Sequence, residues 1–367
     1  MSIFYKNRVM IPVVILMVIG YVYLSSISMI ISQKQHNTPF FYMNKQLISI
    51  VIGFMAWFIA CRIPLSFWQR SYQWMLIVVM LLHVLLVIPG VGKHINGSTR
   101  WINLGMMNFQ LSELAKLSMI IYMSGFSAFK NEDVRDKLFG FFKPITLLVV
   151  MAVLCLLQPD FGAMFVIVVS SSVVLFLAGA RIRHFLMFIV MAGASMTILM
   201  LTSPYRVKRL TAFLDPWANP FSDGYQLTQA LIAIGNGGAF GRGLGNGLQK
   251  MFYLPEAHTD FLFAAMIEES GMTMGLLVIF LFIWMGYNGV KLAKSQIKNR
   301  NWFGYYLCCG ITFQIILQAF INIGVNMGLL PTKGITLPFI SYGGSSILVL
   351  LFAMGIVSRC VYESKEI

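Results

Sequence analysis

The sequence predicts an all-α polytopic membrane protein with ten transmembrane helices, both termini in the cytoplasm and a large extracytoplasmic loop between helices seven and eight. The chain of 367 residues is 58% hydrophobic and only 11% charged, whereas soluble domains are about a quarter charged. Apolar runs long enough to cross about 30 Å of hydrocarbon recur along its length. Lys and Arg lie between these runs and do not line one face, which indicates topology signals and argues against nucleic acid as a partner of this +14 chain.

Ten apolar stretches are expected to span as helices, because a spanning segment must satisfy its own backbone hydrogen bonds and these runs are too long for barrel strands. They are 10–31, 47–63, 74–92, 112–129, 144–158, 162–180, 185–202, 271–291, 305–328 and 345–361. The first follows Lys6 and Arg8 and lacks a cleavage pattern, so it should remain as an anchor. Basic residues in alternate connections predict both termini inside and residues 203–260 outside. The whole chain, 1–367, is expected to be one integral membrane domain that includes this loop.

The loop between the third and fourth spans carries Trp101 and leads into a helix start at Ser112. Ser112 is a candidate N-cap, and Glu113 and Lys116 lie one turn apart, where they can form an ion pair. That pair is either local to the helix start or faces a polar cavity, because ionisable groups inside membranes usually mark one. Trp101 suits an interfacial anchor as well as a substrate contact. A tight outer turn is expected at 159–162, between the fifth and sixth spans.

Residues 203–260 hold most of the polar chemistry of the outer side. A short basic helix over 205–214 carries Arg206 and Arg209 and suits an anionic headgroup, whether of a substrate or of ordinary lipid. A second helix is expected to begin with Asp223 at or near its cap and to end at Gly235. Seven glycines follow within thirteen residues. They either present backbone N–H groups to a phosphate or form a plain flexible turn, and they lack the Walker sequence of a nucleotide site.

The loop closes with His258 and Asp260 ahead of the eighth span. A helix unbroken through 260–293 would be about 51 Å long, more than a bilayer needs. Either its first turns project into water or the chain breaks near Gly271, and both outcomes keep the glutamate pair at 268 and 269 out of lipid. Asp260 is then at a helix N-terminus, as an N-cap or as a reactive group. His258 is either a locally hydrogen-bonded residue or a substrate contact.

The ninth span carries Gln314, Gln318, Asn322 and Asn326, each four residues apart, so they form one polar stripe. The stripe is either interhelical glue or the lining of a cavity. The prolines and glycines that follow it predict an irregular or re-entrant loop that dips toward the site.

Several stretches together resemble the SEDS family (shape, elongation, division and sporulation) of cell-wall polymerases. They are NGSTRWINLG with SELAK, QPDFG, DGYQLTQALIAIGNGGAFGRGLGNG, LPEAHTDF followed by EE, and NIGVNMGLLPTKGITLPFISYGGSS. These stretches occur in order across nearly the entire chain, and the last two resemble the division branch (FtsW) more than the elongation branch (RodA). Leu111 replaces the proline usual in the family, which removes a helix-start proline and no chemistry.

This resemblance implies a ten-helix peptidoglycan glycosyltransferase that polymerises lipid II at the outer face of the cytoplasmic membrane, at the division septum. The essential carboxylate of the family matches Asp260, its loop tryptophan matches Trp101, and its cavity-lining pair matches Glu113 and Lys116. The implied partners are a class B penicillin-binding transpeptidase (FtsI-like) and other divisome proteins.

The expected mechanism is inverting displacement, with Asp260 as the general base for a sugar hydroxyl. Arg206, Arg209 and Lys116 are candidates to neutralise the diphosphate leaving group. The expected substrate-binding residues are Trp101, Glu113, Lys116, Arg206, Arg209, His258, Lys333 and Ser345.

Cofactors and rival functions stay open at the level of sequence. The five cysteines lie in or beside apolar runs, and neither Cys nor His shows metal-ligand spacing, so no disulfide framework or structural zinc is predicted. A divalent cation, Mg²⁺ or Mn²⁺, is an alternative means of neutralising the diphosphate. A lipid II flippase is a rival function, although it should place ionisable groups near the bilayer midplane. A non-enzymatic scaffold that recruits a transpeptidase is another.

Overall fold

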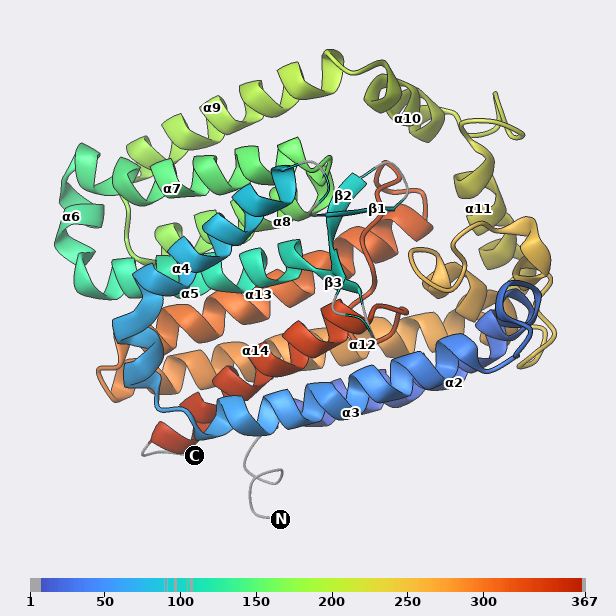
Figure 1. Cartoon of the computed structure of the whole chain (residues 1–367), viewed down its shortest axis with the longest axis horizontal. Coiled ribbons are helices and arrows are strands. Elements are labelled where there is room, and N and C mark those ends of the chain that lie inside the picture. The colour runs from blue at the N-terminus through green and yellow to red at the C-terminus, as the bar shows by residue number, and fades with distance from the viewer. Residues whose placement is uncertain are drawn as a thin grey trace.

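The computed structural model describes residues 8–88, 90, 92–95, 98–103, 105 and 108–364, so Lys6 lies outside the described residues. Within these ranges, ten helices cover the ten predicted spans (Figure 1). They are α2 (Met10–His36), α3 (Phe41–Arg62), α4 (Leu65–Val87), α5 (Leu111–Phe129), α7 (Leu138–Leu157), α8 (Phe161–Leu177), α9 (Ile182–Leu201), α12 (Leu262–Lys298), α13 (Trp302–Asn326) and α14 (Gly344–Glu363). Eight are long and apolar enough to cross a membrane, and the other two are α5 and the 17-residue α8. The chain is therefore a multi-pass, mainly helical membrane protein.

Helix α5 lies at the centre of the bundle and packs against α4, α8 and α13. Nearly all of its side chains are buried, including Glu113 and Lys116. Helix α9 is the opposite case, because only His184 and Phe188 are buried along its length. It runs along the outer edge of the molecule in Figure 1. The polar residues of α5 thus face protein, whereas α9 is largely exposed along its length.

Three short strands between α4 and α5 were not predicted from the sequence. Strands β1 (Lys93–Ile95), β2 (Ser98–Asn103) and β3 (Asn108–Gln110) form an antiparallel sheet in the order β1-β2-β3. The predicted third span, 74–92, was wrong at its end, because α4 stops at Val87 and Ile88 is already extended. Ile88 precedes a proline in the sequence, and such residues disfavour the helical conformation.

The segment 203–260 folds into α10 (Pro204–Leu214), α11 (Tyr225–Gly237) and a short wide helical turn, η1 (Gln249–Tyr253). The basic helix predicted at 205–214 is confirmed. The second helix begins where it was predicted, with Asp223 next to the N-cap residue Gly224, although no side chain caps it. Its predicted end at Gly235 was wrong by two residues, because α11 continues to Gly237. Ser112 is not a cap, since α5 begins one residue earlier and Gln110 precedes it. The tight turn between α7 and α8 is confirmed, with Asp160 at the N-cap of α8.

Helix α12 is broken at Gly271, one of the two outcomes expected from its length. Gly271 has φ +79°, and a side chain there would meet the backbone of Ala239. The glycine-rich loop after α11 lies against this break. Its N–H groups at Arg242 and Gly243 donate to the carbonyls of Glu268 and Glu269. The glycines therefore let one backbone approach another closely, so this loop is not a free turn.

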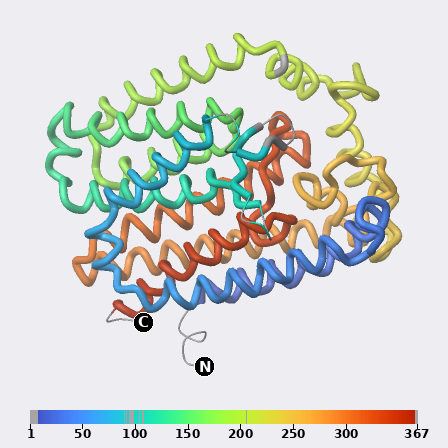
Figure 2. The backbone as a smooth tube through the Cα atoms, in the orientation of Figure 1, coloured from blue at the N-terminus to red at the C-terminus, as the bar shows by residue number. Residues whose placement is uncertain are grey.

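Residues 327–343 connect α13 to α14 without regular secondary structure, yet Ile335, Leu337, Phe339 and Ile340 are buried. Figure 2 shows this connection, near the red end of the colour scale, beside the β-strands. Side chains satisfy its backbone: Gln46 donates to the carbonyl of Ser341, and Ser341 Oγ accepts from the N–H of Leu337. The predicted irregular loop is thus confirmed, and protein side chains satisfy part of its backbone.

Candidate active site

The segment 332–336 lies beside two of the predicted site residues, Arg209 and Asp260. Arg209 on α10 donates to the carbonyl of Thr332 at 3.1 Å. A Cβ added at Gly334 would lie 3.1 Å from Asp260 Oδ2. The segment 332–336 thus joins α10 and the turn before α12 into one site.

The carboxylate of Asp260 lies in the turn before α12 and is partly buried. Phe261 occupies the N-cap position, and no side chain of the preceding turn caps the helix. The alternative prediction, that Asp260 is the N-cap residue, was therefore wrong. Burial raises the pKa of Asp260 to about 7, with the charge of Glu256 acting in the same direction and those of Arg100 and Arg209 opposing it. A carboxylate with a pKa near neutrality can accept a proton efficiently at physiological pH.

Two cations gather over the aromatic side chain of Phe161, at the start of α8. Lys333 Nζ lies 4.2 Å from the ring centroid and the Arg206 guanidinium 5.3 Å. Lys333 also lies 4.8 Å from the ring centroid of Phe165. Burial and the neighbouring Arg206 lower the pKa of Lys333 to about 8. Neither cation forms an ion pair with a carboxylate in the described part of the chain. Two like charges held this close favour the binding of an anion.

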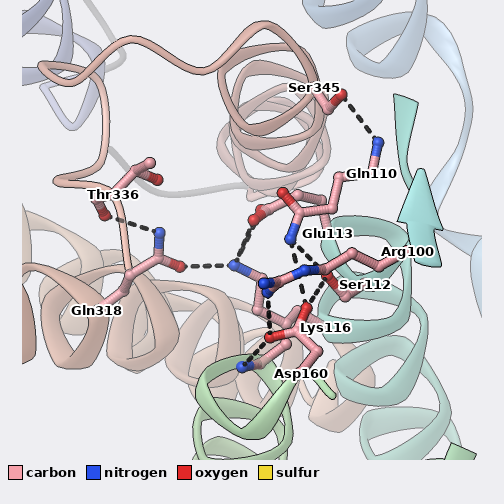
Figure 3. A network of polar contacts seen from close by, with 10 residues as sticks. Arg100, Gln110, Ser112, Glu113, Lys116, Asp160, Gln318, Thr336 and Ser345 are labelled. Carbon is pink, nitrogen blue, oxygen red and sulfur yellow. Dashed lines mark hydrogen bonds and ion pairs between the residues drawn. The ribbon is translucent and has the colours of Figure 1, made fainter. Parts of the chain in front are cut away.

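Glu113 and Lys116 form the predicted pair on α5. Lys116 Nζ lies 2.9 Å from Glu113 Oε2, and it also donates to Gln318 Oε1 at 2.7 Å (Figure 3). Gln318 in turn donates to the carbonyl of Thr336 at 3.1 Å. Both side chains are almost fully buried. The pair is therefore connected through Gln318 to the segment 332–336. These contacts favour a role for Lys116 in positioning that segment over direct neutralisation of a diphosphate.

Asp160 and Arg100 belong to the site although the sequence reasoning did not select them. Asp160 Oδ1 lies 3.0 Å from Arg100 Nη1, and Asp160 Oδ2 accepts from Ser112 Oγ at 2.8 Å and from Gln110 Nε2 at 3.3 Å (Figure 3). One buried carboxylate thus joins the sheet, α5 and α8. The available signal was QPDFG itself, a lone acid in an outer turn between two apolar spans, which we interpreted only as a turn.

The remaining predicted residues lie around this centre. Trp101 is on β2, opposite Gln110 of β3, and is partly buried. Ser345 donates to the carbonyl of Asn108 and accepts from the N–H of Gln110, so its hydroxyl is occupied in holding β3. His258 packs between Tyr42 and Tyr342, with ring centroids 4.7 Å and 6.0 Å away. Its Nδ1 atom finds no hydrogen-bond partner among the described residues, and burial lowers its pKa.

A divalent cation, Mg²⁺ or Mn²⁺, is the sequence-based alternative for neutralising a diphosphate. No group of three or more His, Cys, Asp or Glu side chains that could hold a metal occurs in the described ranges. The residues present therefore do not form a ready-made metal cage there. A divalent cation that arrives with a diphosphate stays a prediction, and no step is assigned to it.

A family model described as cell cycle protein, covering FtsW, RodA and SpoVE, matches residues 7–366. A relative from Coxiella burnetii is 43% identical over 362 residues, which is 99% of this chain and 97% of the relative. A relative from Legionella pneumophila is 44% identical over 95% of this chain and 89% of the relative. Both carry the name probable peptidoglycan glycosyltransferase FtsW.

Solved structures of the same fold are also similar to this chain. One comes from a peptidoglycan synthase complex described as coordinating polymerization and crosslinking, with a TM-score of 0.81, 24% identity and 98% of both chains covered. Another is the rod shape determining protein RodA of Thermus thermophilus, with a TM-score of 0.70, 24% identity and coverage of 98% of this chain and 97% of that one. At this identity the likeness shows the fold.

Proposed function

Because this chain belongs to the FtsW, RodA and SpoVE family of cell cycle proteins, we propose that it is a peptidoglycan glycosyltransferase of the division branch. Its substrate is lipid II, which it polymerises at the outer face of the cytoplasmic membrane, at the septum. The observation that carries this proposal is Asp260, a partly buried carboxylate with a pKa near 7, which lies near a group of cations. A base and an anion site side by side are what transfer of a sugar from a diphosphate requires.

In the proposed reaction, the 4-hydroxyl oxygen of an acceptor sugar attacks the anomeric carbon of the donor. The bond from that carbon to the diphosphate oxygen breaks, and its electron pair leaves with the diphosphate. Asp260 takes the hydroxyl proton as general base. The anomeric configuration changes from α to β in one displacement, so no covalent sugar intermediate is needed.

The leaving diphosphate gains negative charge as its bond breaks. Arg206, Arg209 and Lys333 are the side chains proposed to neutralise it, because all three meet around the segment 332–336. Guanidinium and ammonium groups fixed before the reaction stabilise such charge without reorganisation. The lipid tail would remain in the membrane, and the few buried residues of α9 favour entry of the substrate from the side.

A class B transpeptidase and other septal proteins are the proposed partners. The supporting precedent is the structurally similar chain from a complex that coordinates polymerization and crosslinking. Co-purification of the full chain with the class B transpeptidase of the same cell tests this part of the proposal.

The decisive experiment supplies lipid II to the purified full-length protein, alone and with its transpeptidase partner, and measures glycan strands. Asp260→Asn and Asp260→Ala should abolish strand growth, whereas Asp223→Asn, which changes an exposed carboxylate in the same outer segment, should leave it unchanged. Full activity of Asp260→Asn would remove the general base from the mechanism. Transfer of lipid II across vesicles without any glycan would instead support a flippase.

A further inference from the structure

The N-terminus of α12 is capped by a residue from another helix. The first N–H groups of a helix have no partner within it and usually bond to a side chain just before the helix. Here Asn326, at the end of α13, supplies that acceptor: its Oδ1 atom accepts from the N–H of Ala264 at 3.0 Å. The preceding turn supplies none, although it contains the acid Asp260.

The same asparagine and its neighbour one turn earlier also hold the backbone of Asp260. Asn326 Nδ2 donates to the carbonyl of Asp260 at 2.9 Å, and Asn322 Nδ2 donates to it at 2.8 Å. Asn322 Nδ2 makes a second bond, at 2.6 Å, to the carbonyl of Ile335. An amide nitrogen carries two hydrogens, so Asn322 joins the turn of Asp260 to the segment 332–336 with one group. Both asparagines are almost fully buried.

This arrangement leaves the carboxylate of Asp260 unused by the backbone. Among the residues that the structure describes, no donor forms a hydrogen bond to Oδ1 or Oδ2 of Asp260, whereas its backbone carbonyl accepts two. Without Asn326, the unsatisfied helix end would attract the acid beside it, because a carboxylate is a preferred partner of helix N–H groups. A carboxylate occupied in this way is a weaker base, since hydrogen bonds to the ionised form lower its pKa.

We propose that Asn326 and Asn322 are positioning residues for catalysis: Asn326 caps α12 in place of Asp260, and both asparagines hold the backbone of Asp260, so that its carboxylate is kept beside the segment 332–336. This inference rests on the proposed function of Asp260. It goes beyond the interhelical role that polar residues in membrane helices commonly have. Gln314 lies on the same stripe, two turns before Asn322. Its side chain differs from those of the two asparagines, because its buried Oε1 atom has no hydrogen-bond partner among the described residues.

The test compares Asn326→Leu and Asn322→Leu with Gln314→Leu in the purified full-length protein, with lipid II as substrate. Both asparagine variants should lower kcat about ten- to a hundredfold, as small misplacements of reacting groups do, with little change in KM. The acid limb of the kcat/KM profile should move to lower pH, because a hydrogen-bonded or more hydrated Asp260 is a stronger acid. The charged groups that act on it, Glu256, Arg100 and Arg209, are unchanged in all variants. Gln314→Leu should match the natural protein.

A second variant keeps the proposal testable if the leucine variants do not fold. Asn326→Asp retains an oxygen that can accept from Ala264, and it adds a charge beside Asp260. It should fold and move the acid limb to higher pH. Unchanged kcat and an unmoved acid limb in the folded asparagine variants, with Asp260→Asn inactive, would overturn the inference while leaving the proposed function standing. Full activity of Asp260→Asn would overturn both.

Discussion

Asp260 is a carboxylate whose acidity depends first on its burial and then on neighbouring charges. Its pKa is raised to about 7, chiefly by burial and further by Glu256. In the proposed role of general base, Asp260 must be ionised, so activity should fall as pH drops through its pKa. The proton-accepting form is therefore the major one only above neutrality.

Glu256→Gln should move that dependence. Removing a neighbouring negative charge lowers the pKa of Asp260, so the acid limb of kcat/KM should shift to lower pH, and the variant should exceed the natural protein below pH 7. Initial rates of lipid II consumption across a pH series measure this shift, with Asp223→Asn as the matched control. An acid limb at the same pH in all three proteins would show that Asp260 does not govern it.

Asp160 is the second residue on which the site depends. Asp160→Asn keeps the shape of the side chain but removes its ion pair with Arg100, in which the two atoms lie 3.0 Å apart. Because this pair joins the β-strands to α8, we expect kcat to fall about tenfold or more. The control is Asp136→Asn at the exposed Arg181–Asp136 pair, which should have no effect. Equal activities of the two variants would refute the role of Asp160.

At the scale of elements, the site depends on the short first part of α12, residues 262–270. Asp260 lies before one end of it, and the break at Gly271 forms the other. The glycine-rich loop and η1 cover this break, and Lys250 of η1 lies 2.9 Å from Glu269 Oε1. The loop and η1 therefore fix the direction in which the short helix presents Asp260.

Gly271→Ala should disrupt this element. The position has φ +79°, and a Cβ would lie 2.2 Å from the carbonyl oxygen of Ala239. We expect a loss of more than about 1 kcal/mol of stability, seen as a lower melting temperature, together with reduced polymerisation. Gly193→Ala on α9 is the control, because a Cβ there meets no atom within 4 Å. Equal melting temperatures would contradict this account of the break.

Lys250→Met tests the buried ion pair. Glu269 is 1% exposed, and a buried charge that loses its partner costs about 3 kcal/mol or more. The melting temperature should fall, and Lys250→Met combined with Glu269→Gln should recover part of the loss. Lys137→Met, at an exposed pair on the other side of the molecule, should not change it. If the double variant were less stable than Lys250→Met, the ion pair would not be the cause.

At the scale of the whole molecule, the predicted orientation places the active site outside the cell. The segment with α10 and α11 and the short helix α6 (Asn131–Asp136) lie at opposite ends of the bundle in Figure 1. Basic residues between the spans predict that the α6 end faces the cytoplasm. Lipid II carries its sugars on the outer side in the proposed reaction, so this orientation is required.

Cysteine labelling tests the orientation. Asn219→Cys, in the exposed turn after α10, should react with a membrane-impermeant maleimide in intact spheroplasts, whereas Glu132→Cys should react only after permeabilisation. The natural cysteines are buried or partly buried, so the unsubstituted protein gives the background. The reverse labelling pattern would place Asp260 in the cytoplasm and exclude the proposed reaction.

The sequence alone predicted the number of spans, the basic helix α10 and the Glu113–Lys116 pair. It also offered a break near Gly271 as one of two possible outcomes for α12. These features depend on local properties: apolar length, charge, helical spacing and glycine content. They are readable because each involves residues close together in the chain.

Only the tertiary structure decided which polar residues meet. It placed Asp160 beside Arg100 and supplied the cap of α12 from Asn326 on another helix. It also directed the hydroxyl of Ser345 to a hydrogen bond with the backbone of β3. It also turned the glycine-rich stretch into a close contact with the break in α12. Buried polar groups must find partners wherever the fold places them, and those partners lie far away in the sequence. Spacing along the chain therefore could not reveal that the cap of the helix after Asp260 comes from α13.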